Sequence, residues 1–202
     1  MQTLAIAPSN LKVGLFNNVD LQFIVETYTI LRTSGHDPQA HETVSGFGDV
    51  LIRCKTNFWG NDGGTTAGGM MPFLKLPTGA TELGNAAVEG GVIFPLAITL
   101  PQEWSMGLMT EVDHLRNSDS SNYHQEFINS ITFGHGIIGQ LAGYLEFFSS
   151  ISSERDVEWI GTVDFGLTYK LRSNVQLDAG VNIGVTRAAD DLNSFVGLSV
   201  RF

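Results

Sequence analysis

The stretch that decides the fold is Gln176–Phe202, which reads QLDAGVNIGVT, then RAADDLN, then SFVGLSVRF. The first and last of these runs alternate apolar residues with polar residues or glycine. The apolar positions are Leu177, Ala179, Val181, Ile183, Val185, Val196, Leu198, Val200 and Phe202. A period of two is typical of a β-strand with one apolar face, so the stretch predicts a hairpin that breaks at 187–193.

The length of the apolar face separates this hairpin from one in a soluble sandwich. The face is unbroken for about ten residues, roughly what a tilted strand needs to cross a bilayer. The chain also stops on an aromatic residue, Phe202, at the end of a strand. Together these features indicate the closing hairpin of an outer-membrane β-barrel.

The composition supports a membrane protein that spans by strands. The 202 residues fit one domain, 1–202. Only 16% of the residues are charged, below the usual quarter of a soluble domain. No window reaches the roughly twenty apolar residues of a membrane-spanning helix. The net charge of −10 argues against nucleic acid as a partner, because there is no basic stripe to neutralise phosphates.

The start of the chain and its one cysteine give less information about the fold. Met1 is followed by QTLAIAPSN, which has neither the basic start nor the apolar core of a signal peptide. We expect a chain that begins after its export signal. Cys54 has no second cysteine for an intrachain disulfide.

Alternating runs recur along the whole chain, each ending in turn residues. We expect roughly eleven strands: 3–16 (kinked at 8–10), 20–32, 46–59, 65–77, 91–100, 104–116, 125–138, 141–152, 158–171 and the two runs of the closing hairpin. The segment 33–45 is expected to be a loop. Short connections near 17, 61, 102, 139 and 173 alternate with longer, more polar ones near 40, 84, 120, 155 and 190. This pattern predicts an all-β, antiparallel up-and-down transmembrane β-barrel with short periplasmic turns and longer outer loops.

If the apolar face meets lipid, the polar face lines the lumen. A charge that faced lipid would cost a few kcal/mol at the bilayer midplane, so the charges should point inward. Basic residues cluster in the first half of the chain and acidic ones in the second, and in a closed barrel the two halves face each other. The lining and solute path is therefore predicted to consist of Arg53, Lys55 and Lys75 facing Glu111, Asp113, Glu126, Glu146 and Asp164. These charges either pair to stabilise a narrow barrel or act as a selectivity lining for a small solute.

Aromatic residues mark the expected membrane interfaces. Seven lie at strand ends, as in interfacial girdles: Phe16, Phe58, Trp59, Trp104, Tyr169 and Phe202 beside short turns, and Trp159 beside a long loop. By alternation Cys54 falls on the lipid face, where a thiol behaves as a small apolar residue. His135 falls on the same face and is an exception to the pattern.

Several segments resemble a known family. They are TLAIAPSNLKVGLFNNVDLQF (3–23), GFGDVLIRCKTNF (46–58), LKLPTG (74–79) and the closing hairpin. In the same order along nearly the whole chain, they are similar to the outer-membrane transporter family named for the meta-pathway of phenol degradation. The resemblance implies a Gram-negative outer-membrane barrel that passes small hydrophobic or aromatic compounds inward. Family members carry a signal peptide and one further strand before the position of Met1, so the resemblance implies a complete barrel of about twelve strands, an even number.

Signs of catalysis and metal binding are weak. His36, Asp37 and His41 share one loop and could hold a metal, but a solvated loop is favoured. Asp113, His114 and the serines at 118, 120 and 121 lie near one loop without a nucleophile motif. We expect neither an enzyme nor a cofactor.

The hypothesis is a passive channel for small, hydrophobic or aromatic solutes in the outer membrane. Its expected partners are membrane lipid and lipopolysaccharide, the solute, and the barrel-assembly machinery, which would read the strand end at Phe202. Two alternatives stay open: a non-conducting barrel with a structural or surface-binding role, and a soluble lipid-binding barrel with its apolar face inside.

Overall fold

The protein is all-β and antiparallel. The computed structural model describes residues 2–34, 41–80, 83–84, 86–117 and 121–202. None of these residues forms a helix, so the described part contains no helix able to cross a membrane. The strands are β1 (Gln2–Ile6), β2 (Ser9–Phe16), β3 (Val19–Val25), β4 (Tyr28–Ser34), β5 (His41–Gly46), β6 (Val50–Trp59), β7 (Thr66–Leu76), β8 (Glu89–Thr99), β9 (Ser105–Arg116), β10 (Tyr123–Ile138), β11 (Leu141–Ser152), β12 (Ile160–Arg172), β13 (Val175–Gly184) and β14 (Leu192–Val200).

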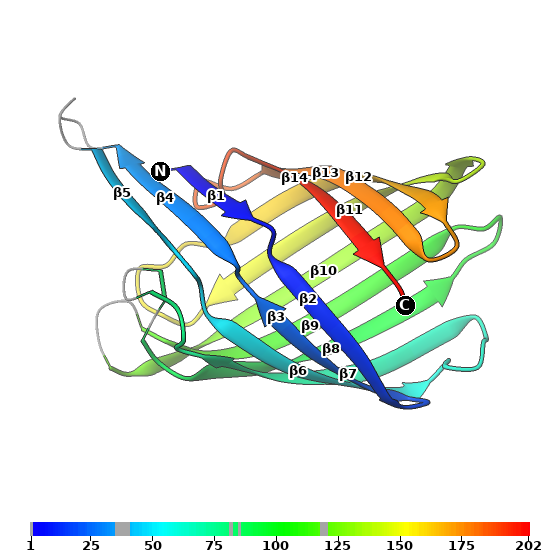
Figure 1. Cartoon of the computed structure of the whole chain (residues 1–202), viewed down its shortest axis with the longest axis horizontal. Helices are drawn as coiled ribbons and strands as arrows, with labels where there is room; N and C mark the ends of the chain where they lie inside the picture. Colours follow the sequence, from blue (N-terminus) through cyan, green and yellow to red (C-terminus); the bar gives the residue numbers. More distant parts are fainter. Residues whose placement is uncertain (1, 35–40, 81–82, 85, 118–120) are drawn as a thin grey trace.

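Eleven of these strands form one sheet, in which the neighbours follow the chain from β2 to β14. Every strand in the sheet is antiparallel to the next, as the up-and-down pattern predicts. Figure 1 shows the sheet curled about a long axis, with the N-terminus towards one end and the C-terminus towards the other. The predicted closing hairpin is confirmed as β13 and β14.

Three further strands, in the order β1-β4-β5, extend the sheet at the end near the N-terminus (Figure 1). They continue β2, β3 and β6 past local breaks. Proline at position 8 and a left-handed Ala7 (φ 51°) make the first break, close to the predicted kink. Thr27 Oγ1 donates a hydrogen bond to the carbonyl oxygen of Ile6 (2.7 Å), and Gly48 N–H donates to that of Glu26 (2.9 Å). The breaks in the three strands therefore lie side by side, at the same height along the sheet.

The prediction that 33–45 forms a loop is wrong at both ends: β4 extends to Ser34 and β5 begins at His41, while 35–40 lies outside the described residues. His41–Gly46 pairs along β4, with Thr43 opposite Arg32 and Val44 opposite Leu31. This segment is polar and lacks a clear apolar alternation. Because the extension projects beyond the main sheet, it needs no continuous apolar face to form a backbone ladder.

The connections separate the two ends of the sheet. Turns 17–18, 139–140 and 173–174 have two residues each, and together with 60–65 and 100–104 they lie at the C-terminal end of Figure 1. The strand ends that border 77–88, 117–122, 153–159 and 185–191 lie at the other end. The predicted alternation of short and long connections holds for most of these strands, but 60–65 and 117–122 each have six residues, and the connection predicted near 40 lies outside the described residues.

The two faces of the sheet differ in burial. Glu89 (2%), Asp49 (4%), Asp113 (6%) and Asp164 (8%) are among the least exposed side chains. The large apolar residues of the other face are exposed, such as Val196 at 86%. Side chains on the concave face converge while those on the convex face diverge, so the polar face is the inner one.

The curled sheet does not close into a complete barrel. No pairing joins β2 to β14, and no Cα of β14 lies within 8 Å of a Cα of β1 or β2. The sheet has an odd number of strands, so its two edge strands run in the same direction. An antiparallel ladder between them is therefore impossible, and a seam remains.

The native cysteine allows a test of this register. Leu21 in β3 lies directly opposite Cys54 in β6, whereas Phe23 lies opposite Ile52. Directly opposed residues have Cα atoms about 4.5–5.5 Å apart, within disulfide range, and diagonal neighbours are about 7–8 Å apart. We expect Leu21→Cys to lose both free thiols on mild oxidation, measured by thiol titration and mass. The matched variant Phe23→Cys should keep both thiols, and a disulfide forming equally in the two variants would contradict the register.

Candidate functional site

The concave face carries one continuous row of paired residues across eight strands. Successive pairings join Lys12, Gln22, Arg53, Phe73, Gly91, Asp113, Glu126 and Ser152. Three predicted lining residues, Arg53, Asp113 and Glu126, thus share a face and a level. Glu111 lies two positions from Asp113 on β9 and faces the same way.

At the centre of this row lies a compact polar cluster. The Arg53 guanidinium carbon lies 5.9 Å from the centroid of the Phe73 ring, within cation–π range. Arg53 also interacts electrostatically with Glu111 and Asp113. Arg53 Nε and Asp113 Oδ1 are buried and have no hydrogen-bond partner. Arg53 thus interacts electrostatically with acids of the second half of the chain, but within the described residues no ion pair joins it to them, and carboxylates outnumber cations here.

Gly91 makes room for this cluster. A Cβ at this position would meet Asp113 Oδ1, and it would lie 2.7 Å from the Val112 carbonyl oxygen and 2.8 Å from Phe73 Cε1. These distances are too short for non-bonded carbon contacts. The absence of a side chain at residue 91 therefore lets the ring of β7 and the carboxylate of β9 approach each other.

A second network lies nearer the end with the long connections. Lys75 Nζ lies 3.0 Å from Glu89 Oε2 and 3.6 Å from Asp49 Oδ2. The carboxyl side chains of Glu89 and Asp49 are 0% and 2% exposed. The Arg116 N–H donates a hydrogen bond to Glu89 Oε1 (3.0 Å). Lys75 was predicted to face acids of the second half, but its ion pairs are to Asp49 and Glu89 on nearby strands.

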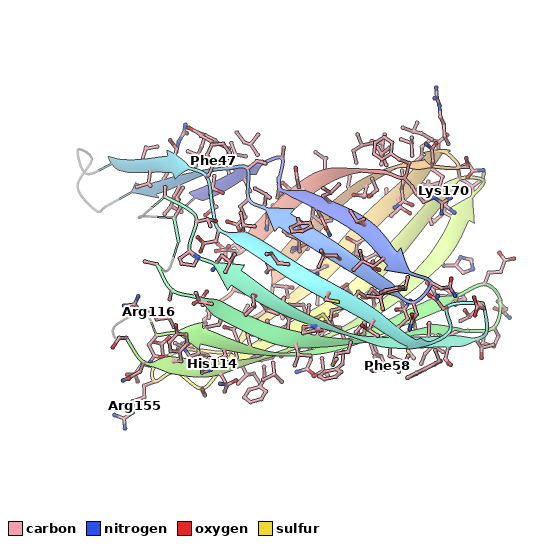
Figure 2. All side chains as sticks on the ribbon, turned by 60° about the horizontal axis from the view of Figure 1, so that its bottom comes forward. Phe47, Phe58, His114, Arg116, Arg155 and Lys170 are labelled. Carbon is pink, nitrogen blue, oxygen red and sulfur yellow. The ribbon has the colours of Figure 1, made fainter. Side chains whose placement is uncertain are left out.

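The connection between β7 and β8 packs over this network. Gly79 N–H donates a hydrogen bond to Asp49 Oδ1, and Val50 N–H donates to Thr78 Oγ1, both at 2.9 Å. Ala80 N–H donates to the Phe47 carbonyl oxygen, also at 2.9 Å. The sequence segments GFGD (46–49) and KLPTG (75–79) are therefore one structural unit. Figure 2 shows Phe47 and Arg116 at the same end of the sheet.

The acidic residues of β11 and β12 lie on the opposite wall. Glu146 pairs directly with Asp164, which pairs with Asn182. Thr132 Oγ1 donates a hydrogen bond to Glu146 Oε2 (2.6 Å). In the described part of the chain, no ion pair reaches Glu146 or Asp164.

Lys55 borders a separate cavity of about 250 Å³. The concave-face residues that line it include Asn57, Ala67, Gly69, Pro95, Ala97, Gly107, Met109, Ser130 and Thr132. Most of these side chains are small or apolar. The arrangement offers a space with apolar walls and a single ammonium group.

Three residues of the concave face were given no functional role by the sequence analysis. Glu89 had been assigned to a loop and Phe73 had no assigned role, although Phe73 is in phase with Lys75 on β7. Tyr144 stands on the polar face of β11 beside Glu146. Strand phase alone could have identified Phe73, but Glu89 precedes the predicted strand 91–100, and its ion pair with Lys75 follows from the register of β7 and β8.

The remaining candidates from the sequence are the residues considered for metal binding and for catalysis. His36 and Asp37 lie outside the described residues, as does the side chain of His41, and no group of three metal-ligating side chains occurs within the described ranges. His114 stacks on Tyr123 at 4.6 Å, and lies at the end of the sheet with the long connections (Figure 2).

The structure also accounts for the exception at His135. Its Nε2 lies 3.1 Å from the Gln102 carbonyl oxygen, and its ring lies 4.6 Å from that of Trp104. His135 therefore belongs to an aromatic cluster at a short turn, where polar groups can be satisfied.

The comparison with known families gives one match. A family model described as "Putative MetA-pathway of phenol degradation" matches residues 8–202, nearly the whole chain. Among curated proteins, none matches the sequence.

The Lys75 network should contribute strongly to stability. Lys75→Met removes the ammonium group that lies 3.0 Å from Glu89 and 3.6 Å from Asp49, and breaking a buried ion pair costs about 3–5 kcal/mol. We expect the free energy of unfolding in urea, measured in detergent micelles, to fall by about that amount. Lys170→Met removes an exposed lysine from β12 (Figure 2) and should change it little. Equal losses in the two variants would contradict the role of the network.

Proposed function

The chain belongs to the family described as "Putative MetA-pathway of phenol degradation", and on this premise we propose that it is an outer-membrane channel for small hydrophobic or aromatic solutes. The solute would diffuse through the lumen on the concave face without a cofactor. The lining would consist of Arg53, Lys55, Lys75, Glu111, Asp113, Glu126, Glu146 and Asp164.

The single observation that carries the proposal is the opposite character of the two faces. Phe147 (40% exposed), Phe165 (46%) and Leu167 (50%) lie on the convex side of β11 and β12. Soluble monomers rarely expose contiguous apolar patches larger than a few hundred Å². A lipid environment would accept this face, and the polar groups would then line a path through the bilayer. The same distribution counts against a soluble lipid-binding barrel, which would be apolar inside.

The aromatic residues at the strand ends fit the same placement. Trp104 (43% exposed) and Tyr169 (46%) lie at the end with the short turns, and Trp159 (46%) lies at the other. Aromatic side chains are enriched at both membrane interfaces. On this proposal lipid and lipopolysaccharide contact the convex face, and the assembly machinery reads the strand end at Phe202.

The cavity beside Lys55 supports a small hydrophobic or aromatic solute. Its walls combine the apolar surfaces of Pro95 and Met109 with gaps left by Gly69 and Gly107. Lys55 adds a cation that can interact with an aromatic ring or a hydroxyl oxygen. A passing solute needs such weak contacts, because tight binding would slow its exit.

A specific observation favours the second candidate, a non-conducting barrel with a structural or surface-binding role. The ion pairs of Lys75 and the hydrogen bonds of segment 78–80 join the ends of β6, β7 and β8 at one end of the lumen. Single-channel recording separates the candidates, because a barrel that is permanently closed gives no open events at any voltage.

Filling the cavity tests the proposed path. Ala97→Trp places a large ring on the concave face, while the adjacent Ile98→Trp places it on the convex face, away from the cavity lining. We expect Ala97→Trp to reduce phenol uptake into proteoliposomes several-fold, and Ile98→Trp to leave uptake close to that of the unmodified protein. Uptake unaffected by Ala97→Trp would exclude this path.

A further inference from the structure

Two carboxylates face each other directly across neighbouring strands of the concave face. Glu146 in β11 is the register partner of Asp164 in β12. Directly opposed residues have Cβ atoms about 4.5–5.5 Å apart, and like charges in this position destabilise a sheet. The pair thus needs a compensating group nearby.

The protein supplies little of that compensation. Thr132 donates one hydrogen bond to Glu146. Asp164 is 8% exposed, and its Oδ1 is buried without a hydrogen-bond partner. Its other register partner, Asn182, is neutral. A buried carboxylate oxygen without a donor is costly, and it is the kind of group that a cation would satisfy.

A third carboxylate, Asp178, and the phenol of Tyr144 stand on the same wall as the Glu146–Asp164 pair. Tyr144 interacts electrostatically with Glu146, Asp164 and Asp178. Its ring occupies the space that a Cβ at Gly166 would fill. The hydroxyl and the carboxylates therefore gather oxygen atoms on the wall formed by β11, β12 and β13.

Within the described residues, no ion pair of a concave-face cation reaches Glu146 or Asp164, Lys55 and Lys170 included. Lys75 pairs with Glu89 and Asp49, and Lys12 pairs with Asp20 at 3.0 Å. Arg53 lies against Phe73 among acids of β9. The excess of negative charge on this face is consistent with the net charge of −10 for the whole chain.

We propose that the Glu146–Asp164 pair is a transit site for a monovalent cation and makes the lumen select cations over anions. This inference rests on the proposed channel function and specifies its solutes as neutral or positively charged. Carboxylate rings give cation selectivity in channels. A monovalent ion suits a transit site because conduction requires binding weak enough for the ion to leave.

The test is the reversal potential of single channels in a planar bilayer under a KCl gradient. We expect the unmodified protein to pass K⁺ in preference to Cl⁻. The double variant Glu146→Gln/Asp164→Asn should lower the permeability ratio several-fold. Glu158→Gln removes an acid from an exposed connection and should leave the ratio unchanged. Heat-modifiable mobility in gels checks that each variant is folded.

The outcomes separate this inference from the proposed function. Open channels that prefer Cl⁻, or a ratio that the double variant does not change, would overturn the inference and leave the channel intact. Absence of open events in the unmodified protein would overturn the channel.

In that last case a binding measurement still decides on the cation site. We then compare thermal unfolding in KCl and in N-methylglucamine chloride at equal ionic strength. A bound K⁺ raises the midpoint of the unmodified protein and of Glu158→Gln but not of the double variant. Equal midpoints in the two salts would refute the site.

Discussion

A single curled sheet has no second layer to pack against, and this constraint decides where each class of side chain lies. In a sandwich, apolar faces bury one another between two sheets. Here the concave face is the only interior. Within the described residues the buried apolar side chains are Phe73, Ala87 and Ile93, fewer than the buried polar ones: Gln22, Asp49, Glu89, Asp113, Ser150 and Asp164. The interior is thus polar, and its stability depends on hydrogen bonds and charge compensation more than on apolar packing.

The concave face accommodates its buried carboxylates in three ways. Lys75 supplies a direct ion pair to Glu89. Arg53 lies near several acids and is held against an aromatic ring. Glycine supplies space instead of charge, since Gly91 lies opposite Asp113 and Gly197 opposite Asp178, and a Cβ at either glycine would meet the carboxylate. A glycine gives a carboxylate room but does not neutralise its charge. The wall containing Asp178 is therefore more negative than the wall containing Lys75.

The period of two was sufficient to predict most of the fold, because side-chain alternation reports directly on strands and their faces. It identified β13 and β14, the inward face of Arg53 and most of the order of short and long connections. It failed for β5, whose polar sequence lies in an extension without an apolar face. The period of two could not predict which charged side chains form ion pairs, because the partners depend on strand register and on how the connections fold back. Lys75 meets Asp49 only because the segment 77–80 packs against Phe47 and Asp49.

Strand parity explains why the two edges of the eleven-stranded sheet remain unpaired. With eleven strands in strict succession, β2 and β14 run in the same direction, and both keep a free edge (Figure 1). Unpaired N–H and C=O groups are costly in hydrocarbon, so such an edge is a liability in a bilayer. Two copies inserted in the same orientation would offer each other only parallel edges. One strand that runs opposite to both edges would satisfy both with antiparallel ladders. No Cα of β14 lies within 8 Å of a Cα of β2, so the two edges are too far apart to pair with each other directly, since paired strands lie about 4.8 Å apart.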